Sequence, residues 1–283
     1  MSDGPRTRGP KPRAPQSSPW GPRHRTPGGP HPSTEAPAGT EVARELRIHG
    51  FNAVQAVFTQ RPDALRKLYL SEARIPQFQP LLRWCVDHRI GYRVVPEDDL
   101  RKLASSSHHE GVVADVLRKP ALDLAGWLGG LAPGPQCALW LDGVGNPHNL
   151  GALLRSAAHF GAAVLLPAQS PLGISGAAAR VAEGGAEAVA MVRMGTEEDA
   201  IAQLKGAGFA LVATAVRGGA DLFTQRLPER LVYVLGAEAA GMDPALARDC
   251  DLRVSIPGSG AVDSLNVSAA AAVLLAQWRG GRK

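Results

Sequence analysis

The residue types that could carry chemistry are concentrated in three polar, glycine-containing segments of the C-terminal half of the chain. Segment 141–156 contains an Asn-Pro-His-Asn turn with an arginine six residues after its second asparagine, segment 234–242 contains Gly-Ala-Glu-Ala-Ala-Gly, and segment 255–268 contains Ile-Pro followed by Ser-Leu-Asn-Val-Ser. Each segment follows a predicted apolar strand, and ligands of open α/β sheets bind beyond the carboxyl ends of the strands. Three polar loops at one edge of a sheet are what a binding or active site requires.

Each segment also has a purely structural explanation. Asn146 before Pro147 could be a helix N-cap followed by proline at the first helical position. The turn 236–241 could be an ordinary connection from a strand to a helix, and Ser264 could simply cap the last helix. Each explanation is adequate for one segment, whereas a site accounts for all three together.

Several familiar chemistries do not fit these residues. The run 236–241 is not the dinucleotide fingerprint, because Glu238 stands where a glycine would let the backbone approach a pyrophosphate. The phosphate-binding pattern GxxxxGK[ST] does not occur. The triplet 108–110 (His-His-Glu) has no CxxC partner and no second histidine pair, so we expect no metal and interpret it as a loop before a strand that starts at Gly111.

The apolar pattern predicts the sheet that would position the three segments. Because the expected strands are apolar along their whole length, the sheet should be covered on both faces, as parallel sheets are. A long final helix is expected at 264–279. The predicted strands are 137–141, 162–166, 186–192, 210–213, 231–235 and 252–256.

A smaller unit precedes this sheet. Its alternation of helices and strands over about 75 residues predicts an α/β/α sandwich. The predicted domains are a tail at 1–40, the small domain at 41–119, a linker at 120–136 that can form a short helix at 122–128, and the large domain at 137–283. The small domain is expected to have helices at 52–60, 80–89 and 98–104 and strands at 67–70, 92–95 and 111–117.

The positive charge of the chain belongs mostly to its N-terminal part. Residues 1–40 contain ten Pro and six Gly and have a net charge of +4, against +3 for residues 41–119 and −2 for residues 120–283. With so few apolar side chains, the first 40 residues cannot bury enough surface to offset the entropy of ordering a chain. We therefore predict a disordered basic tail.

The sequence also bears on the compartment. No apolar run follows the early arginines, which argues against a signal peptide, and no apolar stretch approaches the roughly 18 to 20 residues that span a bilayer. Cys85, Cys137 and Cys250 have neither zinc-site nor disulfide-framework spacing, so we expect three free thiols in a reducing cytoplasm. The predicted protein is soluble and cytoplasmic, and it does not contact a membrane.

Taken together, the three segments resemble motifs 1, 2 and 3 of the SpoU/TrmH family of RNA ribose 2′-O-methyltransferases, which belongs to the SPOUT superfamily. Residues 41–119 resemble the L30e-like substrate-binding domain found ahead of some of these catalytic domains, most recognisably at His109-x-Gly111-Val112. The chain departs from many relatives at Asn146, where they have aspartate. Asparagine keeps the capping geometry and loses a charge, so position 146 is given no catalytic role.

This resemblance implies a small L30e-like α/β/α domain followed by a SPOUT α/β domain with a mainly parallel sheet and a C-terminal trefoil knot, although knots are almost absent among folds. It implies that S-adenosylmethionine binds in the knot, largely through backbone groups, and that the protein is a homodimer with each active site completed near the partner subunit. The implied cofactor-binding residues are Leu235, Gly236, Glu238, Gly241, Ile256, Pro257, Leu265 and Asn266.

The implied reaction is in-line attack of a ribose 2′-hydroxyl on the sulfonium methyl, accelerated mainly by positioning and by help with the hydroxyl proton. A free guanidinium is a poor base at neutral pH. We therefore favour Arg155 as the group that holds the 3′-side phosphate and stabilises developing negative charge, and leave proton acceptance open. Asn149 should position Arg155 or the ribose, Glu238 should orient Arg155 or nearby backbone, and Ser264 and Asn266 should complete the pocket.

The charge distribution then has a use, because RNA affinity depends largely on neutralised phosphates. The tail and the small domain would bind rRNA or tRNA. One alternative is an RNA-binding or assembly factor that keeps the fold while methylation is dispensable, and another is a methyltransferase that acts on a base nitrogen. Candidate phosphate contacts in the small domain, which could equally form a solvated basic face, are Arg61, Arg66, Lys67, Arg74, Arg83 and Arg89.

Overall fold

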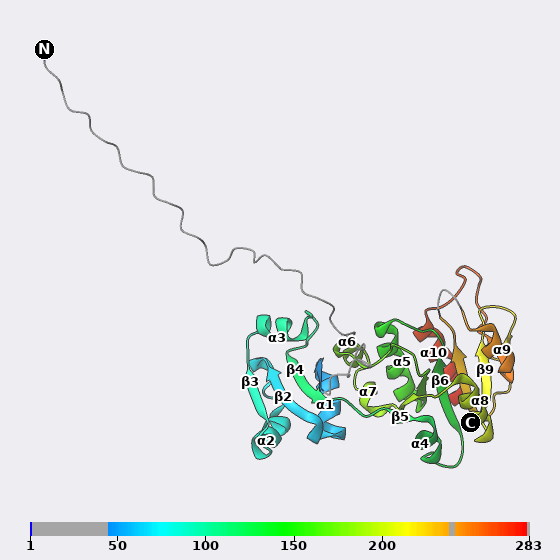
Figure 1. Ribbon diagram of the computed structural model, residues 1–283, viewed down its shortest axis with the longest axis horizontal. Helices are drawn as coiled ribbons and strands as arrows, with labels where there is room; N and C mark the ends of the chain where they lie inside the picture. The colour runs from blue at the N-terminus through cyan, green and yellow to red at the C-terminus, as the bar shows by residue number, and fades with distance from the viewer. Residues whose placement is uncertain (2–44, 238–240, 282–283) are drawn as a thin grey trace. The chain divides into compact units, whose positions relative to one another are not determined.

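The structure of the protein is a computed structural model that describes residues 45–237 and 241–281, together with Met1. Residues 43–283 form one compact unit. The tail predicted at 1–40 therefore lies, apart from Met1, outside the described residues, as does Glu238. The described part of the chain forms two sheets, each with its own helices (Figure 1).

The first sheet has four strands in the order β1-β4-β2-β3. Strand β4 lies antiparallel to both β1 and β2, and β3 lies parallel to β2. Short 3₁₀ turns flank β2 at Pro62–Ala64 and Glu72–Arg74. The elements are β1 (Glu45–His49), α1 (Phe51–Gln60), β2 (Leu65–Leu70), α2 (Gln79–Asp87), β3 (Gly91–Val94), α3 (Glu97–Ala104) and β4 (Val112–Leu117).

Helices cover both faces of this sheet. Successive side chains of a strand point to opposite faces, and in β4 Val112 and Ala114 pack in the core formed with α1 and α2. Val113, between them, packs with Tyr69 and with Leu100 of α3. The prediction of a small α/β/α sandwich is therefore confirmed.

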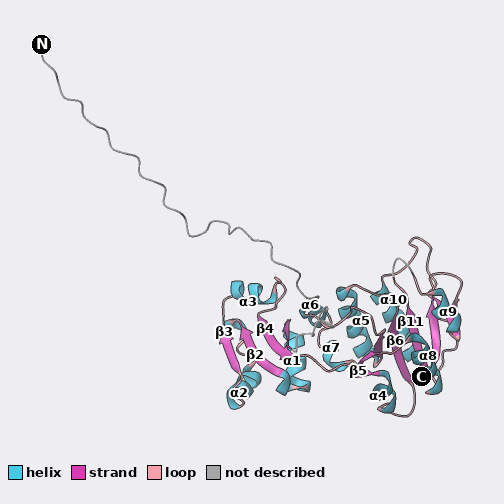
Figure 2. Cartoon of the chain, viewed as in Figure 1, coloured by secondary structure: helices cyan, strands magenta, loops and turns pink. Residues whose placement is uncertain are grey.

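The second sheet has eight strands in the order β10-β12-β9-β11-β6-β7-β8-β5, and every pairing within it is parallel. Helices lie on both sides of its strands (Figure 2). The strands are β5 (Leu122–Asp123), β6 (Gln136–Leu141), β7 (Ala163–Leu166), β8 (Met191–Arg193), β9 (Ala210–Thr214), β10 (Ala220–Asp221), β11 (Arg230–Leu235) and β12 (Leu252–Ser255). The helices are α4 (Leu124–Gly129), α5 (Pro147–Phe160), α6 (Gly176–Val181), α7 (Gly185–Ala188), α8 (Glu197–Gly206), α9 (Pro244–Asp249) and α10 (Val267–Gly280).

Strand β6 shows why its sequence is apolar throughout. Leu139 and Leu141 face a core that includes α5 and α10, whereas Ala138 and Trp140 face the core formed with α4, α8 and α9. The chain thus passes from α9 on one face to α10 on the other after β12. This path is consistent with the knot that the family resemblance implies.

Most predicted elements are confirmed to within a few residues, and two differ. Residues 186–192 were expected to form one strand, but they contain the end of α7 and the start of β8. The last helix begins at Val267 rather than at Ser264, and its N-cap is Asn266, so Ser264 does not cap it. Within 120–136, helix α4 agrees with the short helix expected there, and β5 joins the edge of the larger sheet by pairing with β8.

In the described ranges 45–237 and 241–281, no helix has the length and apolar character needed to cross a bilayer.

Cys85, Cys137 and Cys250 are free thiols, and the first two are buried. Burial raises the pKa of the Cys85 thiol to about 11. This thiol is therefore protonated and unreactive at neutral pH.

Candidate active site

The first polar segment leads from the end of β6 into α5. Asn146 caps α5, because its Oδ1 accepts a hydrogen bond from the backbone nitrogen of His148 at 2.9 Å, and Pro147 occupies the first helical position. The structural explanation of Asn146 and Pro147 is therefore correct for these two residues. Their function is to fix where α5 starts, and α5 carries Asn149 and Arg155.

Two aspartates join the first segment to the second. The Asp142 nitrogen donates to the carbonyl of Leu235 at 2.9 Å, which continues the pairing of β6 with β11. The Asp142 Oδ2 accepts from the Asp243 nitrogen at 3.0 Å. Asp243 in turn caps α9 through its Oδ1, which accepts from the Ala245 nitrogen at 2.6 Å. The loops after β6 and β11 are thus held side by side.

The second segment is a tight turn that closes on itself. The nitrogen of Ala237 donates to the carbonyl of Gly241 at 2.9 Å, and the nitrogen of Gly241 donates back at 2.8 Å. A Cβ added at Gly236 would collide with the carbonyl carbon of Gly241 and the nitrogen of Met242 and would lie 2.7 Å from the Gly241 oxygen. Glycine is therefore required at position 236 by backbone contact. Glu238, which follows Ala237 in the sequence, lies outside the described residues.

The third segment reaches the first through two asparagines. The Nδ2 of Asn266 donates to the Oδ1 of Asn149 at 3.1 Å. The Oδ1 of Asn266 accepts from the Ser268 nitrogen at 2.9 Å and so caps α10. Helices α5 and α10 pack against each other. The structure therefore brings Asn149 and Asn266 together at the adjacent N-terminal ends of two helices.

The loop between β12 and α10 is open to solvent. Ile256 is half-buried, and residues 257–266 are exposed. Ser264 lies in this exposed stretch, and Leu265 keeps 47% of its surface exposed. An apolar side chain this exposed beside polar loops is available to contact a ligand or a partner.

Arg155 lies on α5 six residues after Asn149, about 9 Å further along the helix axis. Its side chain is exposed, whereas Leu153 and Leu154 are fully buried in the core beneath α5. The guanidinium therefore faces solvent on the α5 side of the sheet, where a large substrate can reach it.

Acidic groups gather on the opposite side, near α8 and α9. Burial, followed by repulsion from Asp142 and Asp243, raises the pKa of Glu197 above its ordinary value. Asp142 and Asp243 thus place negative charge near Glu197, whereas Arg155 is exposed on the side of α5.

The site therefore offers amides, backbone groups of tight turns and one guanidinium. Such a set can orient two reactants and stabilise developing charge, which are the requirements of a transfer reaction between bound partners. Within the part of the chain that the structure describes, no group of three or more His, Cys, Asp and Glu is arranged to hold a metal ion. In the His108-His109-Glu110 loop, the Nδ1 of buried His109 is hydrogen-bonded to the Gly111 nitrogen at 3.1 Å.

Sequence reasoning missed the structural role of Asp142, Asp243 and Ser255. The Ser255 hydroxyl accepts from the Gly219 nitrogen at 3.0 Å and so fixes the loop after β9 against the end of β12. Only the positions of Asp142 and Ser255 in the sequence could have indicated their roles, since each stands at or directly after the end of a predicted apolar strand. No sequence pattern indicates that Asp142 bonds to residue 243, about 100 positions later.

Comparisons with known proteins agree with this geometry. A model of the SpoU rRNA methylase family matches residues 136–276, and a model of the RNA 2′-O ribose methyltransferase substrate-binding domain matches residues 47–120. The chain is 36% identical to the uncharacterized tRNA/rRNA methyltransferase YfiF of Escherichia coli O157:H7, over 95% of this chain and 81% of that protein. It is 32% identical to the 23S rRNA (guanosine-2′-O-)-methyltransferase RlmB of Neisseria meningitidis serogroup B, over 84% of this chain and 96% of that protein. An S-adenosylmethionine-bound rRNA methyltransferase from Sinorhizobium meliloti superposes with a TM-score of 0.70 at 25% identity, over 85% of this chain and 88% of that one.

Proposed function

The chain belongs to the SpoU rRNA methylase family, and we propose that it transfers a methyl group from S-adenosylmethionine to a ribose 2′-hydroxyl of rRNA or tRNA. The observation that carries this proposal is the contact of Asn149 with Asn266, which joins the first and third motifs at one sheet edge. The RlmB relative acts on a guanosine of 23S rRNA according to its name, so ribosomal RNA is the first substrate to test.

The three loops support binding of the cofactor. The backbone of Gly236 approaches that of Gly241 so closely that any side chain would push the turn open. At Gly236 only backbone groups take part in this contact. The solved relative with S-adenosylmethionine shares the fold of this chain. Leu235, Gly236, Gly241, Ile256, Pro257, Leu265 and Asn266 would hold the cofactor, together with Glu238.

In this reaction the cofactor supplies an electrophilic methyl group on a sulfonium, and the protein supplies position and charge. Arg155 would hold a phosphate next to the reacting ribose and stabilise the charge that develops as the hydroxyl loses its proton. Asn149 is itself positioned by the Nδ2 of Asn266. Asn149 and Ser264 would orient the ribose, and Glu238 would orient Arg155 or nearby backbone.

A homodimer would complete the site. Arg155 is about 9 Å along α5 from Asn149, and its side chain faces solvent. A pocket that includes both residues must therefore be closed by other atoms, such as those of a second subunit. Exposed apolar residues stand on loops of the larger domain after β9, β10 and β12, and a second subunit could cover them. They are Val216, Phe223, Val262 and Leu265. We also propose the C-terminal trefoil knot and the domain limits 41–119 and 137–283.

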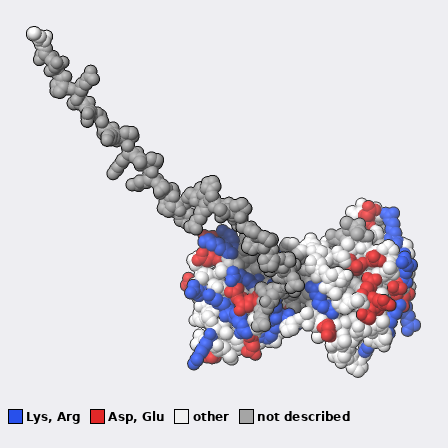
Figure 3. Space-filling view, viewed as in Figure 1, with Lys and Arg blue, Asp and Glu red and all other residues white. Residues whose placement is uncertain are grey.

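Basic side chains support RNA binding by the small domain, and Figure 3 shows Lys and Arg (blue) spread over the face of residues 45–117. The structure divides the six candidates. Arg61 binds Glu187, and the Nε of Arg74 donates to the Glu110 carbonyl at 2.7 Å, so these two have structural partners. Of the other four, Arg66 donates to the Asp63 carbonyl at 3.3 Å and Lys67 lies over the Tyr69 ring, while Arg83 and Arg89 are exposed.

The proposed reaction is tested with purified protein, S-adenosylmethionine carrying a labelled methyl group, and ribosomal or transfer RNA. We expect the label to appear on ribose, where it protects the adjacent phosphodiester from alkali because the 2′-oxygen can no longer attack the phosphate. Label on a base nitrogen would favour a different acceptor. RNA binding without cofactor binding in calorimetry would favour the alternative of an assembly factor for which methylation is dispensable.

Replacing the six Lys and Arg of residues 1–40 with glutamine is expected to weaken RNA binding most at low salt. If all six contact phosphates, the slope of log affinity against log salt should become shallower by up to about 4 for single-stranded RNA. The measurement is filter binding between low and moderate salt. A serine-for-proline variant of the tail with its charge intact is the control. An unchanged slope in the glutamine variant would show that the tail does not contact RNA.

A further inference from the structure

We propose that the ion pair between Arg61 and Glu187 is a positioning link, which fixes the catalytic helix α5 relative to the RNA-binding domain and so places Arg155. This inference rests on the proposed function and names residues outside the three motifs. Arg61 follows α1 in the small domain, and Glu187 belongs to α7 in the large one.

The pair is bidentate. The Nε of Arg61 contacts Oε2 of Glu187 at 2.6 Å, and the Nη2 contacts Oε1 at 2.8 Å. The remaining Nη1 donates to the carbonyl of Leu117 at 2.5 Å, at the end of β4. Both side chains are largely buried, with 22% of Arg61 and 11% of Glu187 exposed. Paired parallel hydrogen bonds of this kind fix orientation as well as distance.

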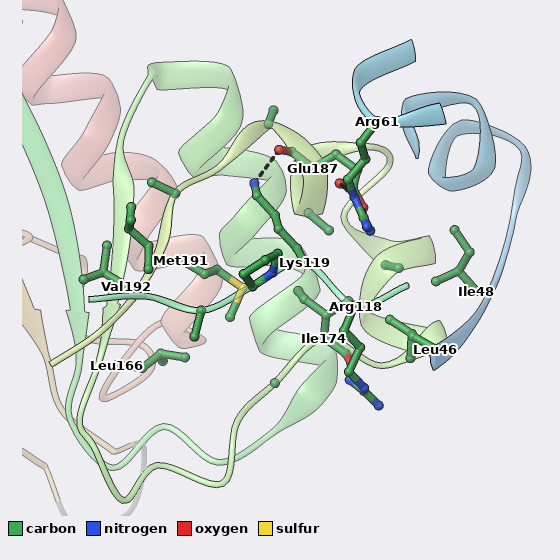
Figure 4. Close-up of a pocket in the computed structure, with 18 of the residues that line it drawn as sticks. Leu46, Ile48, Arg61, Arg118, Lys119, Leu166, Ile174, Glu187, Met191 and Val192 are labelled. Atoms are coloured by element: carbon green, nitrogen blue, oxygen red, sulfur yellow. Dashed lines mark hydrogen bonds and ion pairs between the residues drawn. The ribbon is translucent and has the colours of Figure 1, made fainter. Parts of the chain in front are cut away.

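Lys119 reinforces the same helix. Its Nζ donates to the carbonyl of Glu187 at 2.8 Å (Figure 4) and to that of Val189 at 3.2 Å, at the C-terminal end of α7. Burial lowers the pKa of Lys119 and the nearby Arg61 lowers it further, while Glu187 opposes them. The Glu187 carboxylate therefore compensates two cations that would otherwise repel each other.

A cavity of about 380 Å³ makes these polar contacts important. It lies between the two domains and is lined by aliphatic side chains of both, such as Leu46 and Ile48 of β1 and Met191 of β8 (Figure 4). Ala179 of α6, which also lines the cavity, packs in the small-domain core with Ile48, whereas Met191 packs against the core of the large domain. The polar contacts of Arg61, Glu187 and Lys119 join the domains at α7, beside this apolar contact of α6.

Two consecutive glycines allow close contact of α7 with α1 and with the catalytic helix α5. A Cβ added at Gly184 would lie 3.2 Å from the Cβ of Ala56 in α1, whereas one added at Gly185 would lie 2.7 Å from the carbonyl oxygen of Leu154 and 3.1 Å from the Cα of Arg155. Helix α7 is thus clamped between α1 and the backbone of α5 at Arg155. A shift of α7 must move the helix turn from which Arg155 projects.

The ion pair should therefore affect catalysis and binding differently. Breaking the pair should misplace Arg155 without removing any group that contacts the cofactor or the RNA. A misplacement of about 1 Å can cost about 100-fold in rate. The link would therefore act on turnover rather than on affinity.

The test compares Glu187→Gln with Glu183→Gln in the full chain. Glu183 accepts a hydrogen bond from Asn52 of α1 at 2.5 Å, so the control removes an equal charge from the same junction without breaking the ion pair. We expect Glu187→Gln to lower kcat by about 10- to 100-fold, with the affinities for S-adenosylmethionine and RNA nearly unchanged. Glu183→Gln should keep near-normal turnover.

Rescue distinguishes positioning from general loss of structure. The exchange Arg61→Glu with Glu187→Arg should recover part of the turnover that each single variant loses, and Arg61→Lys covers the case in which Glu187→Gln does not fold. Equal turnover of Glu187→Gln and the unmodified protein, or equal losses in both glutamine variants, would overturn the link. Absence of methylation by the unmodified protein would instead overturn the proposed function.

Discussion

Replacing Arg155 with alanine is expected to lower the rate of methyl transfer by about 10²- to 10³-fold, the loss typical of removing one group that stabilises developing charge. S-adenosylmethionine should bind nearly as before, because the Arg155 side chain faces solvent on α5 and the turn at 236–241 follows another strand. Truncation should not unfold the chain, since the core beneath α5 is built from Leu150, Leu153 and Leu154.

Single-turnover kinetics and calorimetry of the same preparation separate these effects. The Arg155→Lys variant keeps the positive charge and loses the planar set of donors. Partial activity of this variant would indicate that the charge is what matters. Complete loss of activity would indicate a bidentate contact with phosphate. Arg279→Ala removes an exposed arginine from the last turn of α10 and serves as the control. Near-normal turnover of Arg155→Ala would contradict the role assigned to Arg155.

The parallel sheet and the start of α5 could be predicted because local signals suffice for them. Strands such as β6 are apolar at every position since both faces are covered. Asn146 and Pro147 mark a helix start by their own backbone preferences, and the structure confirms a cap there. Family motifs added Asn149 and Asn266, whose contact across 117 positions no local pattern indicates.

Helix α7 could not be predicted because its cause is not local. Gly184 and Gly185 have low helix propensity, and the four residues Gly185–Ala188 are too few to show a helical period in the sequence. The helix forms where its glycines allow close approach to α1 and α5. The same limit applies to β1, whose alternating residues Leu46 and Ile48 gain a sheet partner only when β4 lies beside them.

Basic residues show a related limit. Arg61 and Arg83 look alike in the sequence as candidate phosphate contacts, and both lie in the small domain. Only the structure shows that Arg61 is held by Glu187, 126 positions later, while Arg83 is exposed. Charge counting therefore identifies the domain that should bind RNA, but it does not identify the individual contacts.

Replacing Gly236 with alanine is expected to weaken S-adenosylmethionine binding by about 10- to 100-fold. The new Cβ would meet only backbone, the carbonyl group of Gly241 and the nitrogen of Met242, and backbone cannot rotate away as a side chain can. Inserting a methyl group into a filled space costs about 1–3 kcal/mol, and each 1.4 kcal/mol corresponds to a factor of ten in affinity. The turn 236–241 must open to relieve the overlap, so the damage should fall on the groups proposed to hold the cofactor.

Gly195→Ala is the matched control, because a Cβ at Gly195, after β8, meets nothing within 4 Å. Calorimetry with S-adenosylmethionine should show the loss in Gly236→Ala alone, and thermal unfolding should show whether the overlap also destabilises the fold. A Gly236→Ala protein that is less stable but binds the cofactor normally would place the cofactor elsewhere. Weak cofactor binding with an unchanged melting temperature would mean that the strain is relieved within the turn. The hydrogen bonds that close this turn join Ala237 and Gly241, so the turn can change without disturbing β11.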